Sequence, residues 1–292
     1  MTLTLAKLQQ LKRQAGAAPS MASVVPGPVA PPSPVPSART SIEQLRQLLR
    51  VRAPQSFVEP RSLDRELPGR VLAPGLHLVE AIVADEPLPD AFCGAFDRRD
   101  ALDPSKLLFF DTETTGLAGG TGTRAFMIGA ADWHDGALRI RQLTITTMAA
   151  EAAMLDAFHD WIAADTVLVS YNGKCYDAPL LATRYRLARR ANPLAGLAHV
   201  DLLYPSRRRW RGVYDNCRLA TIERQVLQVV REDDLPGAQA PAAWLSYLRG
   251  GSAHMLRRVL AHNHQDVVSL SRLLRRISGD GHPDVLKKRA HA

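Results

Sequence analysis

The sequence has 292 residues, of which 46% are hydrophobic, and it carries a formal net charge of +8. This composition is that of a globular protein with one large domain or two modest ones, and no apolar run reaches the roughly 18 residues of a membrane span. Three scattered cysteines without a CxxC pair argue against a disulfide scaffold or a zinc ribbon and favour a reducing, cytoplasmic location. The basic charge is compatible with a polyanionic partner without identifying one.

Residues 1–55 predict a basic, proline-rich tail without a core of its own. Seven of the 20 prolines lie between Pro19 and Pro36, which is typical of an extended, flexible linker. Two short stretches with helical periodicity flank this linker, and either could dock on an unknown protein partner. An organelle transit peptide is the alternative for the acid-free start of the chain.

Residues 56–105 predict a small β-containing extension, because the turn-rich text includes short alternating stretches such as "ELPGRVLAPGLHLVEAIV". Stronger signals follow. Strands are predicted at 106–113, 123–133 and 137–146, and the turn "HDG" joins the last two as a hairpin.

After these strands the pattern predicts a helix over 149–164, a buried strand over 165–173, and a mainly helical remainder that ends near residue 277. Three hairpin-connected strands, a crossover helix and a fourth strand predict an α/β domain over 106–278 whose mixed sheet is flanked by helices. Residues 279–292 read as a flexible basic tail.

Two acids lie at the exit of the first strong strand, in "LLFFDTETTGL". Asp111 and Glu113 are at positions i and i+2, so their side chains point to the same face of the strand. Two like charges held there repel each other and resist desolvation, which indicates a cation between them. The pair therefore predicts a metal site whose remaining ligands come from elsewhere in the chain.

Two further acids are candidates for those ligands. Asp177 begins the helix after the 165–173 strand, where an acid can also simply stabilise a helix N-terminus. His262 and Asp266 are four residues apart and share one face of the last helix, with Asp266 beside the apolar stripe. A buried ion pair with an arginine is the alternative role for Asp266.

Taken in order, these motifs resemble the DEDD exonuclease superfamily, which has a ribonuclease H-like fold. A strand with D-x-E, a segment N-x3-aromatic-D and a late helix with H-x3-D carry the resemblance, and "DTETTGL" is similar to DnaQ-like proofreading exonucleases. The longer strings "YNGKCYDAPLL", "DLLYPSRRRW" and "HNHQDVVSL" resemble most the YprB-like family of predicted exonucleases. The resemblance covers about residues 60–277.

The resemblance implies a 3′–5′ exonuclease that uses two Mg²⁺ or Mn²⁺ ions on single-stranded or frayed DNA or RNA. It implies that Asp111 is the bridging ligand, and that Glu113 and Asp266 complete the site for the metal of the nucleophile. Asp177 would hold the metal of the leaving group, directly or through water. His262 would orient or deprotonate the attacking water. Three residues separate His262 from Asp266, as in members that have Tyr in place of His, so the identity of the base stays open.

Six residues are candidates for contact with the nucleic acid, because they flank the acids or combine arginine with aromatic groups: Thr114, Thr115, Asn172, Lys174, Arg208 and Trp210. Three alternatives stay open for the protein as a whole. It could be a structure-specific endonuclease with the same site, a catalytically inactive nucleic-acid-binding module, or a scaffold whose helices and linker matter more than its acids.

Overall fold

The computed structural model describes residues 64–116, 121–231 and 235–279. The chain divides into two units, Met1–Glu59 and Pro60–Ala292, and all described residues belong to the second. The predicted tail over 1–55, with its possible protein partner, therefore lies outside the described residues, as does the predicted C-terminal tail beyond Gly279. No helix in the described ranges combines the length and the apolar character needed to cross a membrane.

A mixed seven-stranded sheet forms the centre of this unit, with the strand order β1-β2-β7-β6-β5-β8-β9. Strand β5 pairs antiparallel with β6 and parallel with β8, and β6 and β7 are antiparallel. The predicted mixed sheet flanked by helices is confirmed. The strands are β1 (Arg70–Ala73), β2 (Leu76–Val83), β5 (Leu107–Thr114), β6 (Ala125–His134), β7 (Ala137–Ile145), β8 (Val167–Ser170) and β9 (Ala198–Asp201).

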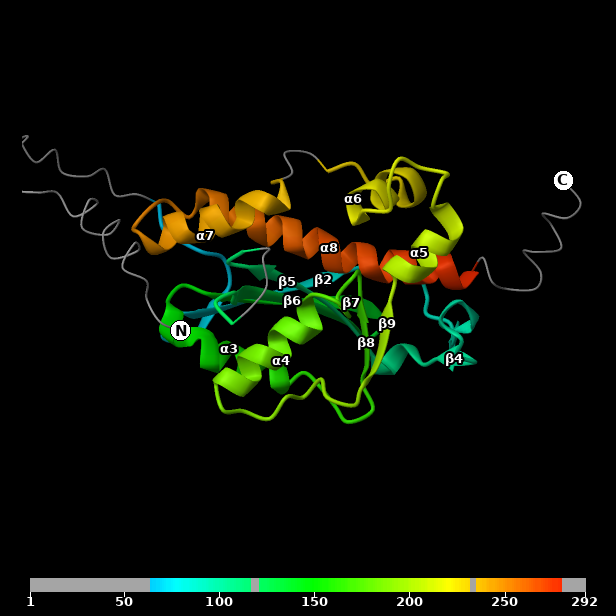
Figure 1. Ribbon diagram of the computed structural model, residues 1–292, viewed down its shortest axis with the longest axis horizontal. Coiled ribbons are helices and arrows are strands. Elements are labelled where there is room, and N and C mark those ends of the chain that lie inside the picture. Colours follow the sequence, from blue (N-terminus) through cyan, green and yellow to red (C-terminus); the bar gives the residue numbers. More distant parts are fainter. Residues whose placement is uncertain (1–63, 117–120, 232–234, 280–292) are drawn as a thin grey trace, which may run out of the picture. The chain divides into compact units, whose positions relative to one another are not determined.

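Helices cover both faces of the sheet. Figure 1 shows α3 (Glu151–His159) and α4 (Asp177–Leu187) on one side, and α7 (Ala240–Leu248) and the long α8 (His254–Gly279) on the other. Beside α8 lie α5 (Leu203–Trp210) and α6 (Leu219–Ile222), and α6 continues into a π-helical turn over Glu223–Leu227. A separate two-stranded sheet pairs β3 (Phe92–Cys93) with β4 (Ala101–Leu102).

Strand β5 is apolar on both faces because both faces are covered. Leu107 and Phe109 belong to a core that includes the C-terminal half of α8, whereas Leu108 and Phe110 belong to the core that includes α3 and α4. A strand buried on both sides reads as a continuous apolar run and not as an alternating one. The acids that follow this run therefore emerge where the core ends.

The predicted hairpin is present between β6 and β7. His134 pairs with Ala137, and the two residues between them, Asp135 and Gly136, both have positive φ angles, of 50° and 77°. A two-residue turn of this kind matches the twist of the strands that it joins.

Two features of the sheet differ from the sequence-based expectation. Strand β2 pairs with β7 along its whole length. Two strands of the segment 56–105, which was predicted as a small β-containing extension, therefore belong to the main sheet. Strand β9 falls in a stretch for which no strand is predicted, and it pairs in parallel with β8. Both pairings join segments distant in sequence, which local patterns do not report.

Candidate active site

The carboxyl end of β5 distributes its polar side chains between two helices. Asp111 and Glu113 approach residues of α8, whereas Thr112 between them donates a hydrogen bond to Asp177 at the start of α4. This alternation follows from the period of a strand. The end of β5 is thus the point at which acids from α4 and α8 come together.

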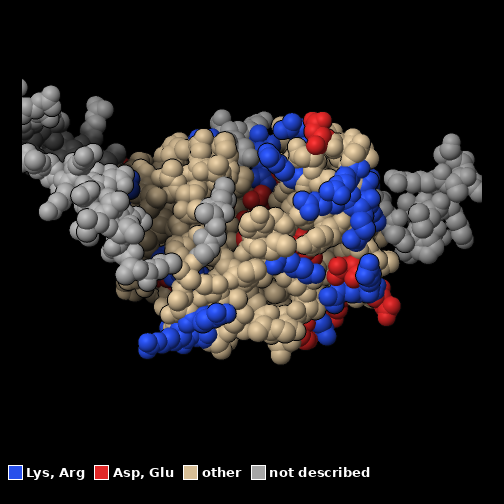
Figure 2. Space-filling view, in the orientation of Figure 1, with Lys and Arg blue, Asp and Glu red and all other residues tan. Residues whose placement is uncertain are grey.

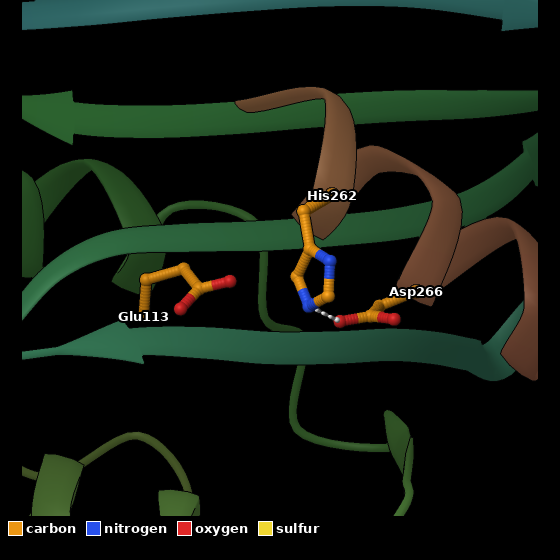
Figure 3. Close-up of side chains that lie close together, drawn as sticks. All are labelled: Glu113, His262 and Asp266. Atoms are coloured by element: carbon orange, nitrogen blue, oxygen red, sulfur yellow. Dashed lines mark ion pairs between the residues drawn. The ribbon is translucent and has the colours of Figure 1, made fainter. Parts of the chain in front are cut away.

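Glu113, His262 and Asp266 form a cluster whose ligand atoms lie within 4.8 Å of one another. Figure 3 shows Glu113 reaching from β5 toward the two side chains that α8 presents one turn apart. His262 Nε2 is 3.4 Å from Asp266 Oδ2. Glu113 is only 8% exposed and Asp266 only 9%. Two carboxylates and an imidazole at this spacing could hold one metal ion.

Arg231 contacts two members of this cluster, His262 and Asp266. Its guanidinium pairs with Asp266 Oδ1, with Glu223 (Nε to Oε2, 2.8 Å) and with His262 (Nη1 to Nδ1, 3.0 Å). Burial raises the pKa of Asp266, although the charges of His262 and Arg231 oppose the rise. Arg231 thus occupies one oxygen of Asp266 while the other oxygen faces His262.

The contact with Arg231 also determines the tautomer of His262. A guanidinium only donates, so Nδ1 of His262 must accept, and the proton of the neutral ring is then on Nε2, toward Asp266. A role as general base or metal ligand through Nε2 requires the other tautomer. His262 can take that role only when Arg231 leaves Nδ1.

Asp111 lies beside the cluster in an environment that disfavours its charge. Burial, followed by the charges of Asp266, Asp177 and Glu113, raises the pKa of Asp111 well above its usual value. Asn263 opposes this by donating a hydrogen bond from Nδ2 to Asp111 Oδ2 over 2.9 Å. Acids from β5, α4 and α8 therefore all disfavour the charge of Asp111.

Asp177 is the acid on the other side of β5. Burial raises the pKa of Asp177 to about 6, and the hydrogen bond from Thr112 works against the rise. Neither Asp177 nor Asp111 belongs to the three-residue cluster of the described residues, but both line a neighbouring cavity of about 430 Å³.

The predicted substrate residues divide between this cavity and other places. Thr114 and Asn172 line the cavity with Asp111 and Asp177. Thr115 donates a hydrogen bond from its backbone amide to the Arg124 carbonyl, and its Oγ1 accepts one from the Arg124 amide. In Figure 2 acidic atoms lie at the bottom of a hollow, and basic side chains gather beside it over α5 and α6.

Arg208 and Trp210 lie on α5, outside the residues that line the cavity. Arg208 donates a hydrogen bond to the carbonyl of Phe96 and remains exposed. Trp210 is half-buried and packs against the core that contains Phe109. Both residues therefore have a role inside the fold in addition to the predicted contact with nucleic acid.

Asp201 supports the loop that carries Asn172 and Lys174. It is 1% exposed and accepts hydrogen bonds from the backbone amides of Asn172 (2.7 Å) and Lys174 (3.1 Å). Asn172 has a φ angle of 67°, which Asn tolerates better than most residues. The Lys174 side chain is exposed at the surface.

His199 packs beneath the same loop. Its Nε2 is 2.7 Å from Ser170 Oγ, and its ring centroid is 5.6 Å from that of Phe110. Burial, followed by the charge of Lys174, lowers the pKa of His199 to about 4. The ring is therefore neutral in the folded protein at neutral pH.

Three residues around the site, Asn263, Arg231 and Glu223, were not predicted from the sequence. Asn263 carried a usable signal, because it lies three residues after Leu260 and four before Val267, within the buried stripe of α8. Glu223 and Arg231 carried none, since a π-helical turn and an irregular segment join them and no periodicity relates them.

Comparison with known proteins gives three findings. A model of the RNase H superfamily matches residues 108–278. The uncharacterized protein YprB of Bacillus subtilis (strain 168) is 37% identical over 167 residues, which are 57% of this chain and 40% of YprB. The family B DNA polymerase from the archaeon Pyrobaculum calidifontis is similar at a TM-score of 0.49 and 17% identity, over 61% of this chain and 25% of the polymerase chain. The chain thus spans less than half of each of these proteins.

Proposed function

The chain belongs to the RNase H superfamily, and on that premise we propose that it is a metal-dependent nuclease that hydrolyses phosphodiester bonds of nucleic acid. The predicted RNase H-like fold is confirmed. More narrowly, the proposal is a 3′–5′ exonuclease acting on single-stranded or frayed DNA or RNA. The observation that supports it best is the meeting of Glu113 with His262 and Asp266, beside the buried Asp111.

The donor set fits a hard divalent cation. The four carboxylates supply hard oxygen ligands, which suit Mg²⁺ or Mn²⁺, and the described residues near the site offer no cysteine cluster of the kind that zinc prefers. The acids are buried, and the charges of Asp266, Asp177 and Glu113 raise the pKa of Asp111, so a bound cation would relieve both the desolvation and the repulsion. In this proposal Asp111, Glu113 and Asp266 hold one ion and Asp177 holds a second.

Bound ions of this kind activate water and neutralise the charge that develops at the attacked phosphorus. The side chains of the protein position the reactants. Arg231 holds one oxygen of Asp266, and Asn263 holds one oxygen of Asp111. His262 orients the attacking water. Thr114 and Asn172 contact the terminal nucleotide in the cavity, and Thr115, Lys174, Arg208 and Trp210 contact the strand outside it.

The test is the degradation of 5′-labelled single-stranded DNA and RNA with Mn²⁺ or Mg²⁺. Wild type should produce a ladder of shortening products, and Asp111→Asn should not. The matched control is Asp135→Asn, because Asp135 lies in an exposed hairpin turn whose left-handed backbone suits Asn equally well.

Other outcomes would replace the proposal with one of its rivals. Cleavage of a circular strand would indicate an endonuclease. Binding that weakens with salt, without cleavage under either metal, would indicate a nucleic-acid-binding module. Equal activity of wild type and Asp111→Asn would exclude the acid site as the source of any cleavage.

A further inference from the structure

Three residues in register across three strands lie under α8. Asp111 on β5 pairs with Gly129 on β6, and Gly129 pairs with Gln142 on β7. Asn263 of α8 lies over Gly129. Asn263 and Gln142 are 0% and 2% exposed, so every polar group of theirs needs a partner within the protein.

Gly129 is the residue that permits this approach. A Cβ atom at position 129 would lie 2.0 Å from Asn263 Oδ1 and 2.8 Å from its Cγ. Glycine in the interior of a strand often marks a place where another group comes close to the backbone. Here the close group is a side-chain amide.

The hydrogen bonds of this amide pair have a single consistent direction. Gln142 Nε2 is 2.8 Å from the Leu260 carbonyl, which can only accept, so Gln142 presents its NH₂ group to α8. The same nitrogen is 2.9 Å from Asn263 Oδ1, which must therefore accept. Asn263 consequently turns its own NH₂ group toward Asp111, with Nδ2 at 2.9 Å from Oδ2.

We propose that Gln142 and Asn263 form a buried amide relay that positions Asp111 as a metal ligand. The relay would hold the Asp111 carboxylate in one orientation through the hydrogen bond to Oδ2. Gln142 acts through Asn263 and prevents its amide from rotating, since a rotated amide would present an oxygen to a carboxylate. This inference rests on the proposed function, because it assigns the relay to the metal site of that nuclease.

The relay would meet two requirements of Asp111 as a metal ligand. The carboxylate must stay in one orientation although it is buried among other acids, and it must keep its charge so that it can bind a cation. A neutral donor meets both demands without adding a competing charge. Outer partners of metal ligands commonly change metal affinity by about 10- to 100-fold when they are removed.

The test measures Mn²⁺ affinity of the full chain, by electron paramagnetic resonance of free Mn²⁺, for wild type, Asn263→Leu and Gln142→Met. Both substitutions keep the approximate volume and remove the amide. We expect about a tenfold or larger loss of affinity for Asn263→Leu and a smaller loss for Gln142→Met. Cleavage should recover in part at saturating Mn²⁺, which a purely structural defect would not show.

Gln265→Met is the matched control, because Gln265 is on the same helix and its amide donates a hydrogen bond to Ser269, away from Asp111. Circular dichroism verifies that each variant folds. If Asn263→Leu does not fold, Gln142→Met still tests the relay, because Gln142 acts on Asp111 only through Asn263 in this proposal. Wild-type affinity in a folded Gln142→Met or Asn263→Leu protein would overturn the relay alone. A wild type that neither binds Mn²⁺ nor cleaves would overturn the proposed function and the relay together.

Discussion

Acid should destabilise this protein through His199. The pKa of the folded ring is about 4, against an ordinary value of 6.5, because burial and Lys174 disfavour the charged form. Below pH 6.5 the unfolded chain takes up a proton that the folded protein refuses until about pH 4. Stability from this group is therefore complete above pH 6.5 and is lost as the pH falls toward 4.

The size of the effect follows from the separation of the two values, about 2.5 pH units, at about 1.4 kcal/mol for each unit. The full loss is thus about 3.5 kcal/mol, a large part of the free energy of unfolding of an ordinary domain. His199→Gln removes the titrating group and keeps a side chain that can hydrogen-bond to Ser170.

The assay is urea unfolding, followed by tryptophan fluorescence, at pH values from 7.5 to 4.5. Wild type should lose about 2 to 3 kcal/mol more than His199→Gln over this range. The difference between the proteins isolates His199 from the acids that titrate in the same range. Parallel curves, or a nuclear magnetic resonance titration of the ring with a midpoint near 6.5, would refute the reasoning.

Three further predictions concern packing, ion pairs and the metal. Gly129→Ala should lower the free energy of unfolding by about 2–4 kcal/mol because the new methyl group overlaps a buried amide, and an unchanged urea midpoint would contradict the close approach. Glu151→Ala leaves the buried Arg184 without its carboxylate and should cost about 3–5 kcal/mol, whereas Asp156→Ala, in an exposed pair, should cost less than about 1 kcal/mol; equal losses by the same assay would show that burial is not the cause. Mn²⁺ at about 100 times its dissociation constant should add about 2.7 kcal/mol of stability, seen as a higher melting temperature, and Glu113→Gln should abolish the gain; a shift that persists in the variant would place the ion elsewhere.

The sequence predicted the central strands because their signals are local. The apolar run before Asp111 marks a strand covered on both faces, and Asp135 with Gly136 marks a tight hairpin. Strand β9 escaped prediction because four residues at the sheet edge carry too little periodicity. The pairing of β2 with β7 depends on contacts between distant segments, which no window of sequence contains.

The candidate site was predictable to the extent that its residues repeat known spacings. Asp111 and Glu113 follow the period of a strand, and His262 and Asp266 follow the period of a helix. What surrounds these residues depends on which elements meet in space. The guanidinium of Arg231 is the clearest case, because its partners come from a π-helical turn and from a helix that begins far along the chain.

The order of the candidate site residues along the chain has a consequence for synthesis. Asp111, Glu113 and Asp177 leave the ribosome well before α8, which supplies the last acid and also closes the core over β5, β6 and β7. Domains generally fold as units once their elements have been synthesised. A nascent chain that still lacks α8 cannot bring His262 and Asp266 to Glu113, so the three-residue cluster assembles only after translation has passed this helix.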